Sequence, residues 1–291
     1  MIFGFAAYLL WGAFPLYFRL MERSGPIEVV AHRALWSLVF CVLALTVLRQ
    51  WDQFSAAVRQ SRSVGVLAVG GLMVAMNWTL YVWGVNTGRT LDAALGYYIN
   101  PLLVALVGVA FLGERLGRAQ WVAFLLGAAA VVVLVVAYGK VPVIALGVAT
   151  TFTLYGVAKK KAGQTVPALP GLAIETLAIA PLALGYIIWL EAAGADSVEI
   201  ASPYGLLMAS TGIVTAVPLL LFAAAAARVP LVTIGMLQYI TPTLQFAVGW
   251  LVFHEPMPPE RWAGFVLVWA AVVVFTVDGV RRHLGTPTPS G

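Results

Sequence analysis

Two short strings place hydrogen-bonding groups inside runs of sequence that are otherwise apolar. They are Tyr-Ile-Asn-Pro at 98–101 and Tyr-Ile-Thr-Pro at 239–242. A proline lacks the N–H donor and its ring clashes with the preceding turn, so a helix loses a hydrogen bond there. The freed carbonyls, together with Asn100 or Thr241 just before each proline, could bind a solute or line a wet cavity. A kink that merely improves helix packing is the alternative interpretation.

A third polar group lies in the apolar run 64–85. Asn77 and Trp78 are mid-run, and Tyr81 follows one turn later on the same face. They could form part of an apolar-lined binding site, or Asn77 could make a hydrogen bond between helices. The complete predicted set has nine substrate-binding residues and two helix breaks: Asn77, Trp78, Tyr81, Tyr97, Tyr98, Asn100, Gln238, Tyr239 and Thr241, with Pro101 and Pro242.

Three ionisable residues also fall within apolar runs, namely His32, Arg33 and Glu175. Charged groups inside a membrane span are costly and are functional candidates by default. Glu175 could carry a coupling proton, or it could form a salt bridge with one of the lysines at 159–161. Arg33 could attract an anion, or it could pair with Glu28.

The composition explains why these residues matter. Of 291 residues, 62% are hydrophobic and 10% are charged, and the mean hydropathy is +0.94. Soluble domains carry about 25% charged residues. A soluble chain of this length would lack the polar surface to cover so many apolar side chains. The chain is therefore predicted to be an all-α integral membrane protein.

A transmembrane helix needs about 20 apolar residues. Runs of about this length, the sixth of them short, predict ten spans: 2–20, 29–48, 64–85, 91–112, 119–138, 141–157, 170–190, 204–226, 231–253 and 261–280.

The distribution of basic residues predicts the orientation. With both termini in the cytoplasm, eleven of the 17 Lys and Arg residues fall on the cytoplasmic side, as the positive-inside rule requires. These are Arg49, Arg59, Arg62, Arg115, Arg118, Lys159, Lys160, Lys161, Arg228, Arg281 and Arg282. The net charge of +5 is thus explained by membrane topology, and no nucleic-acid partner is expected. Cys41 and three scattered histidines offer no metal site.

An internal repeat organises the chain. The two proline strings are separated by 141 residues, and three further identities share that offset: Gly108 with Gly249, Glu114 with Glu255, and Trp121 with Trp262. We expect a first repeat over 1–140, a second over 141–283 and a disordered tail over 284–291. With five helices each, the second repeat must enter the membrane from the opposite side. Inverted repeats are typical of secondary transporters, whose binding site lies at the repeat interface.

Seven strings resemble the RarD-type chloramphenicol-sensitivity proteins, which belong to the EamA family of the drug/metabolite transporter superfamily. They are EVVAHRALWS (28–37), NWTLYVWGVN (77–86), LDAALGYYINPLL (91–103), LGERLGRAQW (112–121), LYGVAKKK (154–161), GIVTAVPLL (212–220) and LQYITP (237–242). The resemblance implies ten helices in two inverted repeats and a location in the bacterial inner membrane. It also implies a central cavity lined by the first four helices of each half. The fifth and tenth helices would then serve as a scaffold or a homodimer surface.

These observations predict a secondary carrier that exports a small organic solute by alternating access. The solute would be an amino-acid-like metabolite or an amphenicol-type drug, and Glu175 would be the residue for proton coupling. No Walker-type phosphate loop occurs, so neither ATP nor another cofactor is expected. A passive channel would need a continuous polar stripe, and an intramembrane enzyme would need an acid–base or metal cluster at depth. The sequence shows neither feature.

Overall fold

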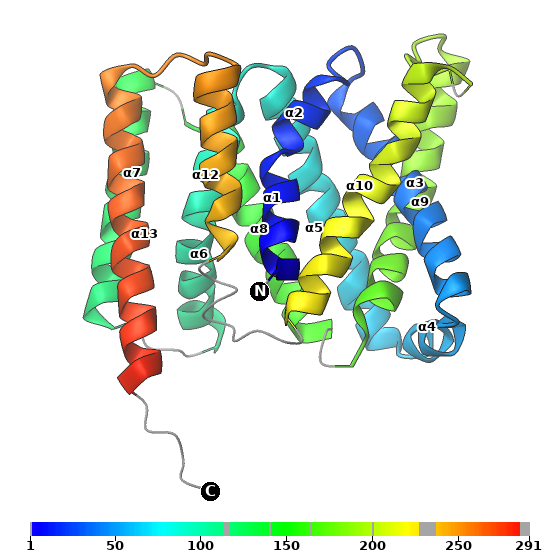
Figure 1. Ribbon diagram of the computed structural model, residues 1–291, viewed down its shortest axis with the longest axis horizontal. Helices are drawn as coiled ribbons and strands as arrows, with labels where there is room; N and C mark the ends of the chain where they lie inside the picture. Colours follow the sequence, from blue (N-terminus) through cyan, green and yellow to red (C-terminus); the bar gives the residue numbers. More distant parts are fainter. Residues whose placement is uncertain are drawn as a thin grey trace, which may run out of the picture.

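The computed structural model describes residues 2–112, 117–139, 141–162, 165–199, 201–226 and 237–285. Its elements, shown in Figure 1, are α1 (Ile2–Gly12), α2 (Phe14–Arg19), α3 (Pro26–Val47), α4 (Trp51–Val58), α5 (Ser61–Asn86), α6 (Thr90–Leu112), α7 (Arg118–Tyr138), α8 (Val143–Ala162), α9 (Ala168–Ala192), α10 (Pro203–Ala226), α12 (Ile240–Ala247), the π-helix η1 (Val248–Val252) and α13 (Pro259–Gly285). Within these residues the protein is entirely helical.

The helices have the length and composition of membrane spans. Seven segments in the described part of the chain are long and apolar enough to cross a bilayer. The helices over 143–159 and 240–252 are shorter but apolar, and α6 covers the predicted span 91–112 with 23 residues. The protein is therefore an all-helical, multi-pass membrane protein, as predicted.

The structure adds one short helix to the predicted spans, and some of the predicted residues lie outside the part of the chain that it describes. Helix α4 lies between the predicted spans 29–48 and 64–85. The first residues of the predicted ninth span, 231–236, and Glu114 and residues 286–291 of the predicted tail lie outside the described residues.

Three helices of the first half each pack against their counterpart in the second half, the helix with the same position in the five-helix order. These pairs are α3 with α9, α6 with α12, and α7 with α13. In each pair the start of one helix lies beside the end of the other. Glu28 in the first turn of α3 accepts hydrogen bonds from Ser197, which follows α9. The backbone N–H of Leu91, at the start of α6, donates to Glu255, which follows η1. The paired helices therefore run antiparallel.

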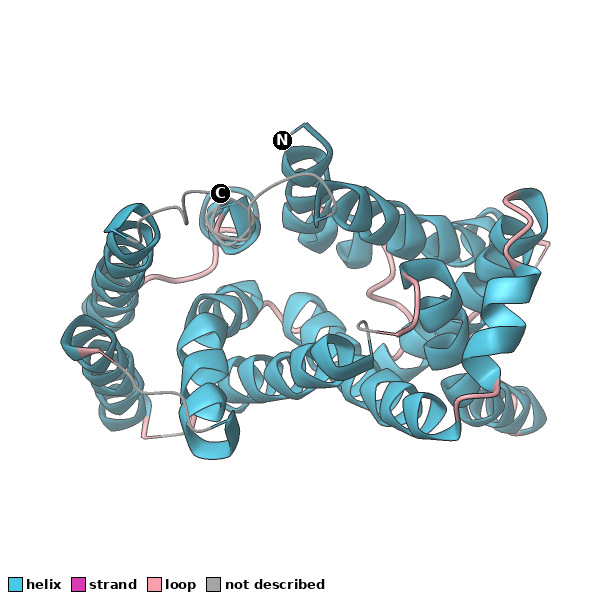
Figure 2. Cartoon of the chain, turned by 90° about the horizontal axis from the view of Figure 1, so that it is seen from below, coloured by secondary structure: helices cyan, strands magenta, loops and turns pink. Residues whose placement is uncertain are grey.

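The most extensive of the other contacts between the halves come in exchanged pairs. Helix α8 packs on α5 and α6, and correspondingly α1 packs on α10 and α12; α3 contacts α10, and α9 contacts α5. Helices α7 and α13 pack on each other at one end of the molecule, on the left in Figure 1, and the same pair lies on the left when the bundle is seen end-on in Figure 2. Their outward apolar side chains, such as Leu125 and Val136, are exposed as lipid-facing residues should be.

Two glycines at matching positions allow close helix contacts between the halves. A Cβ on Gly71 of α5 would lie 2.7 Å from the backbone oxygen of Glu175 in α9. A Cβ on Gly212 of α10 would collide with the backbone carbonyl of Trp36 in α3. Small residues let helix backbones approach in this way in membrane proteins. These two glycines are separated by the repeat offset of 141 residues.

The two prolines have different local geometry. Helix α6 continues through Pro101 from Thr90 to Leu112, so the structure differs from the predicted break at that residue. Pro242 lies in the first turn of α12, which begins at Ile240. A proline in the first helical turn loses little, because N–H groups there have no partner within the helix. Tertiary contacts of α6 hold Pro101 within a helix, at the cost of one backbone hydrogen bond.

Candidate functional site

The two proline strings meet where α6 packs against α12. Tyr98 of α6 and Tyr239, just before α12, stack with ring centroids 6.4 Å apart and planes inclined by 19°. The Tyr98 hydroxyl is 2.7 Å from the Thr243 hydroxyl. Phe265 and Trp269 of α13 contact the Tyr98 ring edge-on. The two halves therefore touch through equivalent tyrosines.

The residue before each proline binds the first helix of the other half. The Asn100 side-chain amide donates to the Ala149 carbonyl at 3.2 Å and to the Thr153 hydroxyl at 2.9 Å, both in α8. The Thr241 hydroxyl donates to the Tyr8 carbonyl of α1 at 3.0 Å. Both side chains are buried. Their hydrogen bonds hold the halves together in matching positions.

Asn77 is also bound to α8. Its amide nitrogen donates to the Val148 carbonyl at 2.9 Å and to the Thr151 hydroxyl at 3.1 Å. Its amide oxygen accepts a hydrogen bond of 3.0 Å from the Tyr97 hydroxyl. This is the interhelical bond that the sequence analysis weighed against direct solute binding. Asn77 thus fixes the Tyr97 hydroxyl relative to α5 and α8.

Arg33 lies in an aromatic environment between the halves. The residue is 3% exposed, and its guanidinium carbon is 3.9 Å from the centroid of the Trp78 ring. Phe18 and Phe14 lie further away, at 5.1 and 5.5 Å. The Arg33 Nε donates to the hydroxyl of Thr215 in α10 at 2.8 Å. This position combines a positive charge with ring faces, which attract cations.

The tyrosines predicted for the site surround the same charge. Tyr81 and Tyr97 have ring centroids 5.9 Å apart, and Tyr97 also contacts Phe152 of α8. Their hydroxyl groups, with that of Tyr17, lie within electrostatic reach of the Arg33 guanidinium. The Tyr17 hydroxyl also lies 2.6 Å from the Ser210 hydroxyl in α10.

Glu175 lies in an ion pair. Its carboxylate is 2.8 Å from the Lys159 ammonium, and the Tyr155 hydroxyl donates to it at 3.4 Å. The Glu175 side chain is 1% exposed, while that of Lys159 is 32% exposed. The pair joins α9 to the end of α8 and matches the salt bridge that the sequence analysis offered as the alternative to proton coupling.

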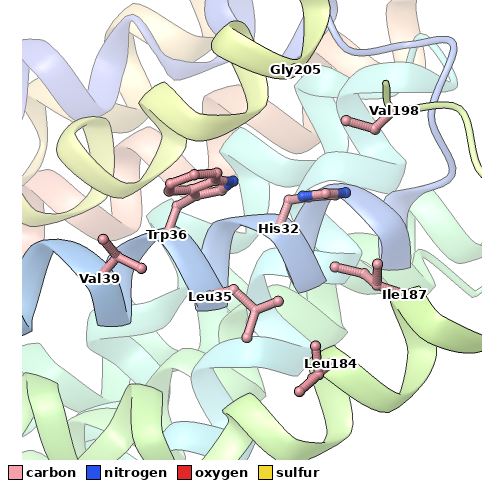
Figure 3. Close-up of a pocket in the computed structure, with 8 residues that line it drawn as sticks. All are labelled: His32, Leu35, Trp36, Val39, Leu184, Ile187, Val198 and Gly205. Atoms are coloured by element: carbon pink, nitrogen blue, oxygen red, sulfur yellow. The ribbon is translucent and has the colours of Figure 1, made fainter. Parts of the chain in front are cut away.

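His32 faces a different part of the molecule. It lines a lateral cavity of about 220 Å³ between α3, α9 and α10, together with Trp36, Leu184 and Ile187 (Figure 3). It also borders a polar cavity of about 340 Å³ that includes Glu28, Glu191, Asp196 and Glu199. Figure 3 shows His32 and Trp36 on one side of α3. His32 and Arg33, adjacent in sequence, therefore face different environments.

The structure divides the predicted residues into two clusters. Trp78, Tyr81 and Tyr97 lie with Arg33, whereas Tyr98 and Tyr239 lie with α13. Gln238 is half-buried near Tyr239. Five residues outside the predicted set complete the clusters: Phe14, Tyr17, Phe18, Thr215 and Thr243. The i, i+4 spacing of Phe14 and Phe18 indicates that they share a helix face. No pattern in the sequence indicates that Thr215 lies near Arg33.

Comparison with known proteins identifies the family. The model of the EamA-like transporter family matches residues 1–136 and again residues 140–277. Protein RarD of Streptomyces exfoliatus is 48% identical over 282 residues, which cover 97% of this chain and 89% of that protein. The Bacillus subtilis (strain 168) protein named uncharacterized transporter YojE is 40% identical over 286 residues, or 96% of this chain and 94% of that protein.

A crystal structure shares the fold. It matches with a TM-score of 0.64 and 23% sequence identity, covering 95% of this chain and 97% of that chain. At that level of identity the match concerns the arrangement of helices alone.

Proposed function

The chain belongs to the EamA-like transporter family, as a RarD-type member and not an enzyme, and from this premise we propose that it is a secondary active exporter of a small organic solute. The proposed mechanism is alternating access, in which two inverted five-helix halves, residues 1–140 and 141–283, rock against each other around a site at their interface. The ten-helix arrangement is part of this proposal.

The antiparallel packing of counterpart helices is the observation that carries the proposal. The pairs α3/α9, α6/α12 and α7/α13 each join equivalent helices of the two halves, and the most extensive of the other contacts between halves, those of α8 with α5 and α6 and of α3 with α10, occur with their exchanged partners. A two-fold axis lying in the membrane plane would produce this pattern. The two successive matches of the family model support the same division of the chain.

The interface between halves offers both a pivot and a site. Tyr98 and Tyr239 lie where the axis would pass, so the halves could tilt about this stacked pair. We place the solute site beside it, among the aromatic side chains of Trp78, Tyr81 and Tyr97. Asn77 and Asn100 are assigned to positioning the helices that form the site, because their amides already bind α8.

The proposed location is the bacterial inner membrane with both termini in the cytoplasm. Helix α1 begins and α13 ends on the same side of the molecule, the lower side in Figure 1, which supports termini on one side of the membrane. The segment with α4 and the basic residues Arg49 and Arg59 lies on that side too. A homodimer formed through α7 and α13 stays a prediction.

Proton coupling through Glu175 also stays a prediction. Protonation of the buried carboxylate would release Lys159 and loosen α8 from α9. The test is the variant Glu175→Gln, assayed in proteoliposomes over a range of pH. If Glu175 couples transport to protons, the variant loses the pH dependence of transport. An unchanged rate and pH profile would exclude proton coupling through Glu175.

The proposed function is tested by solute counterflow. Purified protein is first screened for ligand-induced thermal stabilisation with amino acids, nucleobases, amphenicols and sugar phosphates. Each stabilising compound is then loaded at high concentration into proteoliposomes, and entry of its labelled form is followed. A carrier accumulates label transiently against its gradient, whereas a channel only equilibrates it. Equilibration without an overshoot would favour the channel and overturn the carrier.

A further inference from the structure

Arg33 lies buried without an acidic partner in the described part of the chain. The ion pairs found there involve Arg19, Arg89, Lys159 and Arg261. The carboxylate of Glu28, on the same helix, instead accepts hydrogen bonds from the backbone and hydroxyl of Ser197. Burying an unpaired charge is costly, so such a group is usually paired or functional.

Most of the hydrogen-bonding capacity of Arg33 is unused. A guanidinium has five N–H donors, and within the described residues the one hydrogen bond of this guanidinium is that from Nε to Thr215. The Trp78 ring lies against the guanidinium, 3.9 Å from its carbon, and the two terminal nitrogens donate to no described residue. The edge of a guanidinium is the part that binds a carboxylate through two parallel hydrogen bonds.

A second unsatisfied polar group belongs to the same cluster. The Tyr81 hydroxyl is buried and lacks a hydrogen-bond partner among the described residues. Its ring packs between Tyr97 and Phe18, and the latter also contacts Arg33. Native proteins leave few buried polar groups without partners, and each such case calls for an explanation. An unpaired hydroxyl and an unpaired guanidinium in one cluster point to a missing anion.

We propose that Arg33 and Tyr81 bind the carboxylate of a monoanionic organic solute, an inference that rests on the proposed transport function. One unpaired guanidinium balances one negative charge, which favours a monocarboxylate over a phosphate dianion. The rings of Trp78 beside Arg33 and of Tyr97 beside Tyr81 give the position apolar area, so the remainder of the solute is apolar or aromatic.

The same geometry disfavours a neutral amphenicol in this site. A neutral solute would cover the guanidinium and leave its charge buried without a counter-ion. Sites built for a charged or hydrogen-bonding group strongly reject analogues that lack that group. The inference therefore separates the two solute classes that the proposed function leaves open.

Matched acid and amide pairs test the inference. Phenylacetate and isovalerate are titrated beside phenylacetamide and isovaleramide, together with L-phenylalanine, L-leucine, inorganic phosphate and chloramphenicol. Dissociation constants are measured by calorimetry in detergent for wild type, Arg33→Met, Arg33→Lys and Tyr81→Phe. The matched control is Arg59→Met, which removes an exposed arginine at the end of α4.

We expect one or more acids to bind wild type at least about tenfold more tightly than the matching neutral compound, as charge-assisted hydrogen bonds imply. Arg33→Met should weaken acid binding by about tenfold or more, with Arg33→Lys intermediate because lysine lacks the planar fork. Tyr81→Phe should weaken it by about threefold to tenfold, the loss of one hydrogen bond. Arg59→Met should bind as wild type.

Three results would each overturn the inference: no acid binds wild type, acids bind no better than amides or phosphate, or Arg33→Met retains wild-type affinity. If Arg33→Met fails to fold, Arg33→Lys and Tyr81→Phe decide the matter by the same criteria. Counterflow separates this inference from the proposed function. Acid binding without counterflow would contradict transport alone, whereas Arg33-independent counterflow of a neutral solute would contradict the anion site alone.

Discussion

Arg33 and Glu175 are each the eighth residue of the second long helix in their half, counted from Pro26 of α3 and Ala168 of α9. Both side chains are buried. Glu175 is neutralised by Lys159, whereas Arg33 rests on Trp78 and has no acidic partner among the described residues. Equivalent backbone positions therefore carry charges with different physical roles.

The comparison shows which features the two halves share. The scaffold is matched: Gly71 and Gly212 make equivalent close contacts, and Asn100 and Thr241 make equivalent hydrogen bonds across the interface. The chemistry at the charged positions is not matched. In the proposed mechanism, the symmetric scaffold would provide the two-state movement and the asymmetric set of side chains would provide the binding.

The largest loss of stability is expected from substitutions that disrupt the matched glycine contacts between the halves. Gly71→Ala and Gly212→Ala each place a Cβ against the backbone of the facing helix, and backbone cannot move aside as a side chain can. We expect each to lower the free energy of unfolding by about 3 kcal/mol. The measurement is SDS titration in mixed micelles. Gly65→Ala is the control, because a Cβ there meets nothing within 4 Å. Tolerance of one substitution but not the other would contradict a matched scaffold.

The next prediction concerns the two buried charges, Glu175 and Arg33. The expected change in stability is a loss at Glu175 and no loss at Arg33. Lys159→Met leaves the Glu175 carboxylate buried and unpaired, and should cost about 2 kcal/mol because the lysine is partly exposed. Arg33→Met removes a charge that has no acidic partner, so the ligand-free variant should melt at or above the wild-type temperature. Thermal unfolding in detergent without solute measures both. A lower melting temperature for Arg33→Met would mean that Arg33 has a structural role.

A smaller effect tests the bonds at the two proline strings. Asn100→Ala removes two hydrogen bonds to α8, and Thr241→Val removes one to α1. We expect losses of about 2 kcal/mol and about 1 kcal/mol respectively, at about 1 kcal/mol for each hydrogen bond. SDS titration of the single and double variants measures them. Thr243→Val keeps the side-chain volume and removes the hydrogen bond to Tyr98. Because Thr243 is exposed, this variant should lose less unfolding free energy than either of the other two.

The smallest effect concerns the tyrosine pair. Tyr98→Phe retains the stacked ring and loses the hydrogen bond to Thr243, so the free energy of unfolding should fall by about 0.5–1 kcal/mol. Tyr239→Phe should lower the free energy of unfolding by no more than Tyr98→Phe does. A role as the pivot predicts that Tyr98→Ala slows counterflow far more than Tyr98→Phe does. Equal counterflow rates for the two variants would show that the stacked pair Tyr98 and Tyr239 is not the pivot.

Much of the architecture could be read from particular residues. The offset between Pro101 and Pro242 indicated the repeat, and the same offset separates Gly71 from Gly212 at their equivalent contacts. The aromatic residues at 78, 81 and 97 belong to the nine predicted binding residues, which the structure divides between two clusters. Trp78 and Tyr81 share a face because spacing along one helix determines which side chains do so, whereas Tyr97 joins them from α6.

Other features depended on contacts that no local spacing encodes. Arg33 meets Thr215, which is 182 positions away in the sequence, and Asn77 meets Val148 in the other half. Whether Asn77 binds solute or a neighbouring helix depends on how closely α8 approaches, and the sequence of α5 alone does not fix that distance. The expected break at Pro101 failed for the same reason, since helix packing outweighed a local preference.

The sequence by itself determined the membrane environment, the apolar helices and the duplication, because these follow from composition and periodicity. The tertiary structure alone decided which charge is neutralised. Glu175 and Arg33 look alike in sequence as ionisable residues within apolar runs. A partner reaches Glu175 from the end of α8, whereas tryptophan and threonine reach Arg33 from α5 and α10. Electrostatic pairing acts over a few ångströms in space, so it depends on the helix packing and not on the order of residues.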